Sequence, residues 1–463
     1  MMMYHLYPAV PSIISLIFFF PIFCLVLGIS NDYNKWNINF SPSSVPNLFI
    51  SETKVINFTI SSLKSQCSNE SVIEVISENP DIVLCHPNIF KVENTQNYSA
   101  TFNISGSFMG STHVKLIVTC ADSSNGNQLF QLLPVTVVKS ERLIDKLFTI
   151  SVIILVSIVF LNFGCALNLK MLKESFKKPT NLFIGMISQF LFMPLISYIL
   201  GKLIFIESVS MRLGLFFTGI SPSGGASNIW VCVLGGNINL SVILTALSNL
   251  CAFFMMPIWT FSLGRSIFQS ASLEVPYVRV ASFAVSLVPP LLIGLILQKK
   301  CPKFSQLMVK ILKPFSSCLI VFIIIFATIT NLYLFRLFTG KILLVGLCLP
   351  LFGFISSWLL TWLFKRSIED CLAISVETAV QNTGIAIFML RLSLMQPEAD
   401  LTTVVPVAVA LMTPFPLLFW YGIRKSILYF NSTERKIQDP TLKSFPVKDK
   451  STSMLINQNS PEQ

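Results

Sequence analysis

The sequence predicts an α-helical polytopic membrane protein with nine transmembrane helices, preceded by a small extracellular β-sandwich domain. Three observations predict this class: hydrophobic residues make up 53% of the 463 residues, charged residues only 12%, and the mean hydropathy is +0.70. Soluble proteins carry about 25% charged residues, so a soluble globular protein is excluded. Lipid-facing helices need no polar face, which also accounts for the 40 phenylalanines.

The first thirty residues are typical of a secretory signal. An apolar stretch from Ile13 to Gly28 ends in small residues, and we expect cleavage after Ser30. The segment before this stretch contains no Lys or Arg, so an uncleaved anchor is the alternative. In both cases residues 31–141 are delivered to the extracellular side.

Residues 31–141 form the predicted extracellular domain. They are rich in Asn, Ser and Thr and contain alternating runs of apolar and polar residues at 54–60, 99–105 and 113–119. This period of two, with turn residues between the runs, predicts a small β-sandwich. Cysteines at positions 67, 85 and 120 permit one disulfide with one thiol left over, and the pairing stays open.

Asn-x-Ser/Thr sequons in this domain predict N-glycosylation of an exposed surface. Chance occurrence in an Asn- and Ser-rich segment is the alternative explanation. The acceptor residues are Asn39, Asn57, Asn69, Asn97 and Asn103. The disulfide candidates of the same domain are Cys67, Cys85 and Cys120.

Nine apolar segments of membrane-spanning length follow, within a predicted transporter domain at residues 142–425. With the amino end outside, an odd number of spans places the tail, residues 426–463, in the cytoplasm. Lys-rich loops near the spans agree with this orientation. The tail is polar, and we expect it to be disordered. The predicted spans are 147–166, 180–201, 210–236, 239–263, 277–298, 307–331, 342–364, 370–395 and 402–422.

The positive charge of the chain lies beside these spans. Residues 146–423 carry 19 Lys and Arg against 8 Asp and Glu. Cations that flank apolar segments follow the cytoplasmic bias of membrane proteins, so nucleic acid is excluded as a partner. With a secretory signal and sequons, the plasma membrane is the expected location.

Polar residues inside the spans carry the candidate chemistry, because each is costly in hydrocarbon unless it faces a partner or water. Seven of the eight carboxylates between residues 146 and 423 lie in loops or at span ends, which leaves Glu377 alone at depth. All three His residues precede the spans, so the spans offer no imidazole to relay protons.

Two of the predicted spans are interrupted by residues that break helices. In the third span Pro222, Gly224 and Gly225 precede Ser227 and Asn228, and in the eighth a polar stretch runs from residue 377 to Gly384. Unwound backbone exposes carbonyl oxygens and half-helix ends that can coordinate Na⁺, which prefers hard oxygen ligands. Each side chain alone is explained as well by interhelical hydrogen bonding. Together with a lone carboxylate they predict an ion site.

These motifs resemble those of the bile acid:sodium symporter family, whose broken helix carries Pro-Gly-Gly-x-x-Ser-Asn. The resemblance covers about residues 142–425, and the long amino-terminal domain is similar to that of one branch of the family. It implies two inverted repeats, a core and a panel domain, and two crossing broken helices. The matching residues are 222–228, with Ser223 in place of the first Gly, Gln189-Phe190 before Met193-Pro194, Asn239-Leu240-Ser241, Thr245 and 377–382.

The resemblance implies two sodium sites that share the carboxylate of Glu377. The first Na⁺ is expected on Ser227, Asn228, Ser241, Thr245 and Glu377. The second is expected on Gln189, Glu377, Gln381 and the main-chain carbonyls of Thr378 and Val380. A carboxylate shared by two cations offsets part of their mutual repulsion.

The predicted function is sodium-coupled symport of an amphipathic organic anion, such as a bile acid or a steroid sulfate, by alternating access. The expected partners are membrane lipid, Na⁺ as the coupling ion, and the anion, with no other metal or cofactor. The alternative is a non-transporting glycosylated receptor or adhesion protein built on a transporter scaffold. An enzyme is not expected, because the spans contain no nucleophile–base constellation.

Overall fold

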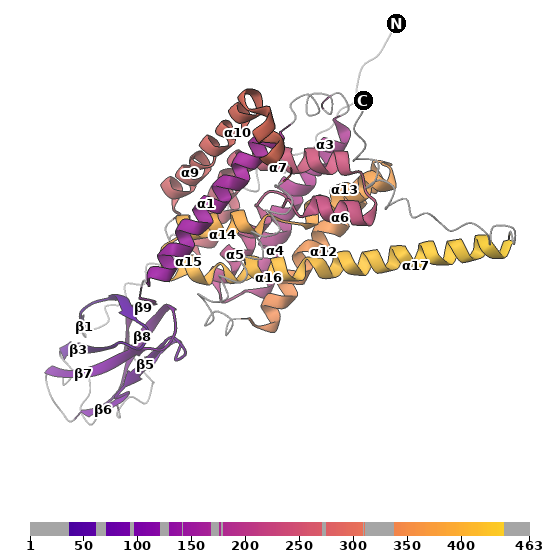
Figure 1. Ribbon diagram of the computed structural model, residues 1–463. Coiled ribbons are helices and arrows are strands. Elements are labelled where there is room, and N and C mark those ends of the chain that lie inside the picture. The colour runs from indigo at the N-terminus through magenta and orange to yellow at the C-terminus, as the bar shows by residue number, and fades with distance from the viewer. Residues whose placement is uncertain are drawn as a thin grey trace, which may run out of the picture.

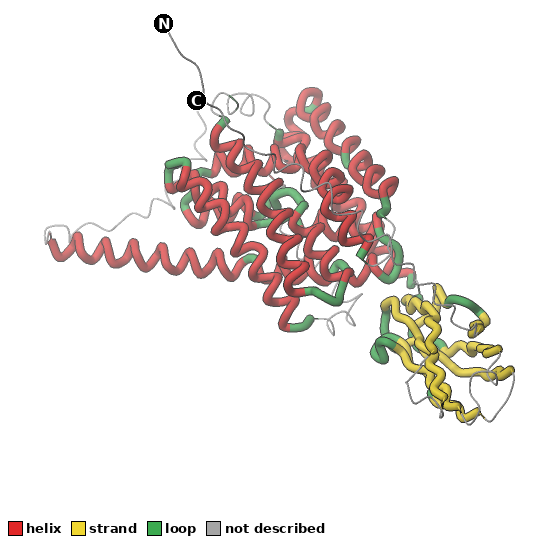
Figure 2. Tube along the Cα trace, turned by 180° about the vertical axis from the view of Figure 1, so that it is seen from behind, coloured by secondary structure: helices red, strands yellow, loops and turns green. Residues whose placement is uncertain are grey.

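A strand-rich amino-terminal part and a helical part make up the chain (Figures 1 and 2). The predicted signal, residues 1–30, and the end of the tail, residues 439–463, lie outside the described residues. The computed structural model describes residues 37–61, 71–92, 97–120, 129–140, 142–167, 176, 179–270, 275–308, 310 and 338–438.

The amino-terminal part is the predicted β-sandwich. One sheet is antiparallel throughout, and in the other β2 and β9 run parallel. The first sheet contains, in spatial order, β1 (Asn37–Ser41), β3 (Thr53–Ser61), β7 (Asn97–Gly106) and β5 (Val83–His86). The second contains β2 (Val45–Phe49), β9 (Leu129–Val138), β8 (Gly110–Cys120), β4 (Ser71–Ser77) and β6 (Ile89–Val92).

The alternating runs in the sequence form β3, β7 and β8 of this sandwich. In β3, residues Ile56, Phe58 and Ile60 are buried between the sheets, and the residues between them are exposed. Full burial of one such side chain contributes about 1.5–3 kcal/mol. The period of two thus sets which face of each strand meets the core.

The described sequons all lie on the outer face of the first sheet. Acceptor and hydroxyl residue are two positions apart, so in a strand both point to the same side. Asn39 and Asn57 lie in β1 and β3, Asn97 and Asn103 lie in β7, and all four are exposed. Asn69 lies outside the described residues.

Cys85 lies in β5 with a free and partly buried thiol, and burial raises its pKa to about 11. Cys67 lies outside the described residues, as does the side chain of Cys120. The disulfide in this domain therefore stays a prediction.

Ion pairs and apolar side chains link the sandwich to the helices. Asp145, in the first turn of α1 (Leu143–Ala166), lies 2.8 Å from Lys139 Nζ and 3.2 Å from Arg142 Nε. Met109, between β7 and β8, is buried in a cluster whose other members include Phe205 and Leu401 of the helical part.

Helices occupy eight of the nine predicted spans, and the sixth, 307–331, lies almost wholly outside the described residues. Among the described residues, five helical stretches are long and apolar enough to cross a membrane. They are Asp145–Cys165, Thr180–Ile204, Ile238–Gln269, Gly340–Leu363 and Glu398–Ser426. The chain is thus a multi-pass membrane protein, with a strand-rich domain ahead of its apolar helices.

Two of the five stretches are single helices, α1 and α12 (Gly340–Leu363), and the other three each combine consecutive elements. The second combines α3 (Thr180–Ile187), the π-helix η3 (Ser188–Phe192) and α4 (Met193–Ile204), and the third combines α7 (Ile238–Trp259), the π-helix η4 (Thr260–Gly264) and α8 (Arg265–Gln269). The fifth combines α15 (Glu398–Leu401), α16 (Val404–Met412) and α17 (Pro414–Gln438).

Three predicted spans are each divided into two shorter helices. The third span consists of α5 (Val209–Gly219) and α6 (Ser227–Leu234), and the eighth of α13 (Ile368–Ala379) and α14 (Thr383–Ser393). The fifth consists of α9 (Tyr277–Ser286) and α10 (Val288–Lys300). None of these pieces is long enough to span a membrane alone.

The prediction of disorder from residue 426 onward is wrong for the first part of the tail. α17 continues to Gln438 and projects away from the other helices as a long arm (Figure 1). The sequence contains no Gly or Pro between Gly422 and Pro440, so nothing in it ends the helix earlier. Polar composition was therefore a poor guide to the helix end.

Candidate functional site

The two interrupted helices meet at their breaks. Gly224 N–H donates to the Val380 carbonyl at 2.8 Å, and Asn382 N–H donates to the Pro222 carbonyl at 2.8 Å. The residues between them, Ser223 and Gln381, form an isolated antiparallel β-bridge. The unwound backbone of each helix thus provides hydrogen-bond partners for the unwound backbone of the other, as buried non-helical backbone in a membrane protein requires.

Gly224 allows this close approach of the two backbones. A Cβ atom at this position would lie 2.9 Å from the Gln381 carbonyl oxygen. The next helix starts from the second break, where the Asn382 side chain accepts a hydrogen bond from Ile385 N–H at 3.2 Å. The break lies at residues 380–382, so the prediction of Gly384 as a breaking residue is wrong: Gly384 lies in the first turn of α14, where Gly is tolerated.

Hydroxyl groups surround the carboxylate of Glu377, which is 3% exposed. Ser227 Oγ donates to Oε1 at 2.6 Å, and Thr245 Oγ1 lies 3.0 Å from Oε1 and 2.8 Å from Oε2. Ser241 Oγ also contacts Oε1, and Ser223 Oγ contacts Oε2. Among the described residues no cation forms an ion pair with Glu377. An uncompensated buried carboxylate is costly, so these hydroxyls offset part of its lost solvation.

The hydroxyls face more acceptor oxygens than they have protons to donate. Ser241 Oγ lies 2.8 Å from Asn228 Oδ1 as well as touching Glu377. Thr245 Oγ1 lies 3.0 Å from the Ser241 carbonyl in addition to both carboxylate oxygens. Each hydroxyl can donate one hydrogen bond, so several of these oxygens converge without a proton between them. A small cation placed among them fits the lone pairs left over.

A second group of amide side chains lies beside the second break. Gln189 Nε2 donates to Gln381 Oε1 at 2.9 Å and to the Ser221 carbonyl at 2.7 Å. Gln381 Nε2 in turn donates to the Thr378 carbonyl at 2.6 Å. Gln189 lies in the π-helix η3, a local widening that is frequent at functional sites.

The structure brings the predicted ligands together in two neighbouring groups. The first contains the whole first set, because Asn228 Nδ2 also donates to Thr245 Oγ1 at 3.2 Å. In the second group the Val380 carbonyl accepts from Gly224 N–H. Among the described residues no three His, Cys, Asp or Glu gather at one place. The donor set is therefore one of hydroxyl, amide and carboxylate oxygens, which suits a hard cation.

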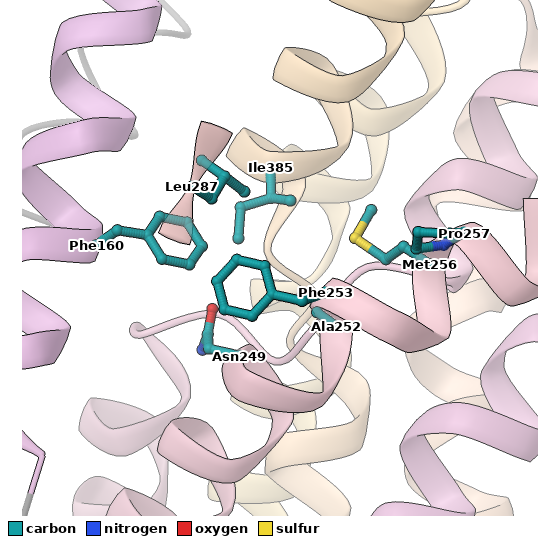
Figure 3. Close-up of a pocket in the computed structure, with 8 residues that line it drawn as sticks. All are labelled: Phe160, Asn249, Ala252, Phe253, Met256, Pro257, Leu287 and Ile385. Atoms are coloured by element: carbon teal, nitrogen blue, oxygen red, sulfur yellow. The ribbon is translucent and has the colours of Figure 1, made fainter. Parts of the chain in front are cut away.

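Two neighbouring apolar hollows, each with a cavity volume of about 10 Å³, lie next to this site. Both are lined by Phe160 of α1 and by Asn249 and Phe253 of α7, and Figure 3 shows these side chains around the first. Asn249 Nδ2 donates to the Thr245 carbonyl at 2.7 Å, which connects the hollows to the predicted ligands. The hollows are lined by side chains of α1, α7, α10 and α14, with Leu291 and Ile385 completing the walls.

Sequence reasoning missed two features. It treated Ser223 only as a departure from a motif, although its hydroxyl touches Glu377. It also placed Asp400 in a loop, whereas Asp400 is 4% exposed and lies 2.8 Å from Arg391 Nη2. An Arg within a predicted span was the available signal, since such a charge needs a partner.

Comparison with known proteins supports a transporter family. Residues 153–336 match the model of the Sodium Bile acid symporter family, a stretch that ends before Glu377. The human "P3 protein" is 31% identical over 261 residues, which cover 56% of this chain and 54% of that protein. The chain thus spans about half the length of the P3 proteins that it matches.

Two further relatives carry transport in their names. The mouse "Sodium/bile acid cotransporter 5" is 23% identical over 426 residues, covering 88% of this chain and 95% of that protein. The mouse "Sodium-dependent organic anion transporter" is 30% identical over 249 residues, covering 53% of this chain and 65% of that protein. With its apolar helices and the matched model, the chain is similar to members of the sodium/bile acid symporter family.

Proposed function

We propose that this protein is a sodium-coupled symporter that carries an amphipathic organic anion into the cell by alternating access. The observation that carries the proposal is the convergence of four hydroxyls on the buried Glu377 carboxylate at the crossing of two interrupted helices. Half-helix ends and unwound backbone at the membrane midplane are the usual setting of coupling-ion sites. The names of the relatives, which refer to sodium, bile acid and organic anions, point the same way.

Two Na⁺ ions are proposed to bind here. The first is held by Glu377, Ser227, Ser241, Thr245 and Asn228, where the excess of acceptor oxygens lies. For the second, between Gln189 and Gln381, the amide oxygens and the Thr378 and Val380 carbonyls are the ligands. Both ions contact Glu377, so each reduces the cost of its charge and orders the ligands of the other.

Ion binding supplies the energy for solute uptake. Two Na⁺ with a monovalent anion carry one net positive charge inward, which is worth about 2.3 kcal/mol per 100 mV of membrane potential. The ions also draw together the two breaks, which come from opposite halves of the chain. A ligand can shift a conformational equilibrium only if its affinity differs between the two states. We propose that Na⁺ binds more tightly when the two breaks are together than when they are apart.

The apolar hollows between α1 and α7 are the proposed place of the organic anion. Their lining is almost entirely hydrocarbon and aromatic, which suits a steroid skeleton. Each hollow, with a cavity volume of about 10 Å³, is far smaller than the roughly 300–1,000 Å³ of a typical small-molecule site. A steroid-sized solute therefore needs α1 and α10 to move away from α7 so that the two hollows join.

The proposed architecture completes the fold with nine spans in two inverted repeats. The panel then contains α1, α9 and α10, and the core contains the two crossing helices. The β-sandwich lies outside the cell at the plasma membrane and carries glycans, and the carboxyl end lies in the cytoplasm. The excess of Lys and Arg in the predicted inner loops supports this orientation.

Tracer uptake tests the proposal. Cells that express the protein are given radiolabelled bile acids and steroid sulfates in Na⁺ medium or in choline medium. Uptake that requires Na⁺ is expected, and Glu377→Ala should abolish it while surface expression persists. Glu207→Ala, which removes an exposed carboxylate, is the control and should transport normally. Full uptake by Glu377→Ala contradicts the proposal, and surface expression without Na⁺-dependent uptake favours a non-transporting receptor.

A further inference from the structure

Ser223 occupies the position between Pro222 and Gly224 at the first break and is 1% exposed. Its hydroxyl donates to Glu377 Oε2, on the opposite side of the carboxylate from Ser227 and Ser241, which contact Oε1. The family motif described above has a glycine at this position, which offers no side-chain oxygen. This chain therefore has a hydroxyl at its ion site that the motif does not require.

The main chain of Ser223 holds this hydroxyl in place. Ser223 N–H donates to Ser248 Oγ at 3.3 Å, and its carbonyl accepts from Asn249 Nδ2 at 3.4 Å. The β-bridge between Ser223 and Gln381 also holds the Ser223 backbone against the second break. The residue is thus anchored to α7 and to the second break at once, so its side chain has little freedom to turn away from the carboxylate.

Ser223 also connects the two groups of predicted ligands. Its hydroxyl contacts Glu377, and its backbone pairs with Gln381, whose amide is bonded to Gln189. Among the described residues the structure shows no direct hydrogen bond from Glu377 to either glutamine. The Oε2 side of the carboxylate therefore reaches the glutamine group through Ser223.

We propose that Ser223 Oγ is an additional sodium ligand, which serves the ion beside Gln381 and couples its binding to the ion beside Ser227. This inference rests on the proposed function, because it needs a sodium site at Glu377. When the second ion binds, the Ser223 proton turns away from Oε2 and a hydroxyl lone pair faces the ion. The ion then takes the place of the hydrogen bond on Oε2, so that the carboxylate holds one ion on each of its oxygens.

Sodium titration of the purified protein tests this inference without transport. An ion that binds the folded state raises the unfolding temperature with its concentration, which gives an apparent affinity and a steepness. Ser223→Ala and Ser223→Gly should both raise the half-maximal Na⁺ concentration about tenfold, because the second ion loses one of its oxygen ligands. Both should also lower the Hill coefficient toward one, because the coupling between the ions is lost.

The pair of variants separates the hydroxyl from the backbone. Ser223→Gly restores the motif residue and Ser223→Ala keeps the Cβ atom, so equal losses assign the effect to the oxygen. Ser357→Ala is the control, because Ser357 is buried in α12 and, among the described residues, its hydroxyl bonds only carbonyls of its own helix. It should titrate like the unmodified protein.

The outcomes distinguish the two proposals. If the unmodified protein responds to Na⁺ and both Ser223 variants titrate like Ser357→Ala, the role of Ser223 is refuted while the sodium site stands. If Ser223→Gly alone loses Na⁺ affinity, the role of the hydroxyl is refuted too, because the change in backbone flexibility then explains the loss. If the unmodified protein shows no response to Na⁺ beyond that to choline, both the sodium site and the role of Ser223 are wrong.

Discussion

Gly224 N–H donates to the carbonyl oxygen of Val380 at 2.8 Å, and this bond joins two helices at the points where each is interrupted. The residues lie in different halves of the helical part and are far apart in the sequence. Their contact brings hydroxyl oxygens of α6 and α7 around the Glu377 carboxylate of α13. The proposed ion site is therefore a property of the crossing and not of either helix alone.

Gly224→Ala should disturb the crossing. The new Cβ would lie 2.9 Å from the Gln381 carbonyl oxygen, so the backbones must separate. We expect a loss of about 1–3 kcal/mol of stability, as for overpacked cores. Thermal unfolding in detergent measures it. The control is Gly422→Ala in α17, where a Cβ meets nothing within 4 Å and Ala is favoured by about 0.8–1 kcal/mol. Equal unfolding temperatures for the two variants would contradict the tight crossing.

Asp400→Asn should destabilise the helical part. Its carboxylate lies 2.8 Å from Arg391 Nη2, and both side chains are less than 10% exposed. Removal of one partner of a buried ion pair costs about 3–5 kcal/mol. Glu207→Gln, at an exposed carboxylate, should change stability by less than about 0.5 kcal/mol. The two unfolding temperatures are compared in detergent, and a similar value for both would show that the pair contributes nothing.

The sandwich should carry its glycans on one sheet. Asn39, Asn57, Asn97 and Asn103 share the outer face of the first sheet, and all four are exposed. Each Asn→Gln substitution should increase electrophoretic mobility by one step, and glycosidase treatment should remove all the steps. If glycosidase treatment leaves the electrophoretic mobility of the unmodified protein unchanged, the prediction of an extracellular sandwich is contradicted.

Cys85 should react slowly with alkylating reagents at neutral pH. Burial raises the pKa of its thiol to about 11, so the reactive thiolate is scarce until the pH approaches that value. Alkylation should rise about tenfold per pH unit up to this range, whereas Ile76→Cys on the exposed outer face should level off near the ordinary value of about 8.5. Mass spectrometry of the labelled peptides gives both profiles, and coinciding profiles would contradict the buried thiol.

The same shift predicts how the stability of the sandwich depends on pH. The folded state favours the neutral thiol, so this contribution is fully present below about 8.5 and is lost as the pH rises toward 11. Chemical denaturation at several pH values measures it. Cys85→Ser should remove this alkaline dependence, and an unchanged dependence in that variant would assign it to other groups.

Much of the fold could be predicted because the pattern of residues decides it locally. The alternation in β3 sets which side chains meet the core, and the length of apolar runs such as α12 sets which helices can span the membrane. Glu377 stood out because a lone carboxylate in hydrocarbon needs a partner. Pro222 and Gly224 marked the first break because neither supports a regular helix there.

The remainder depended on three-dimensional contacts that local patterns do not contain. Whether Ser223 points at Glu377 follows from the backbone path of the break, which the residue types leave open. The π-helix at Gln189 and the pairing of Arg391 with Asp400 need partners from distant segments. The helical start of the tail was missed because polar composition says little about a helix that runs on from a neighbouring span.

Binding of radioactive ²²Na⁺ to the purified protein tests the central claim most directly. The unmodified protein should bind sodium saturably, and Glu377→Gln, which keeps the shape of the side chain but removes its charge, should lose that binding while the protein stays folded. Equal binding by both proteins, or no saturable binding by the unmodified one, would contradict an ion site at Glu377.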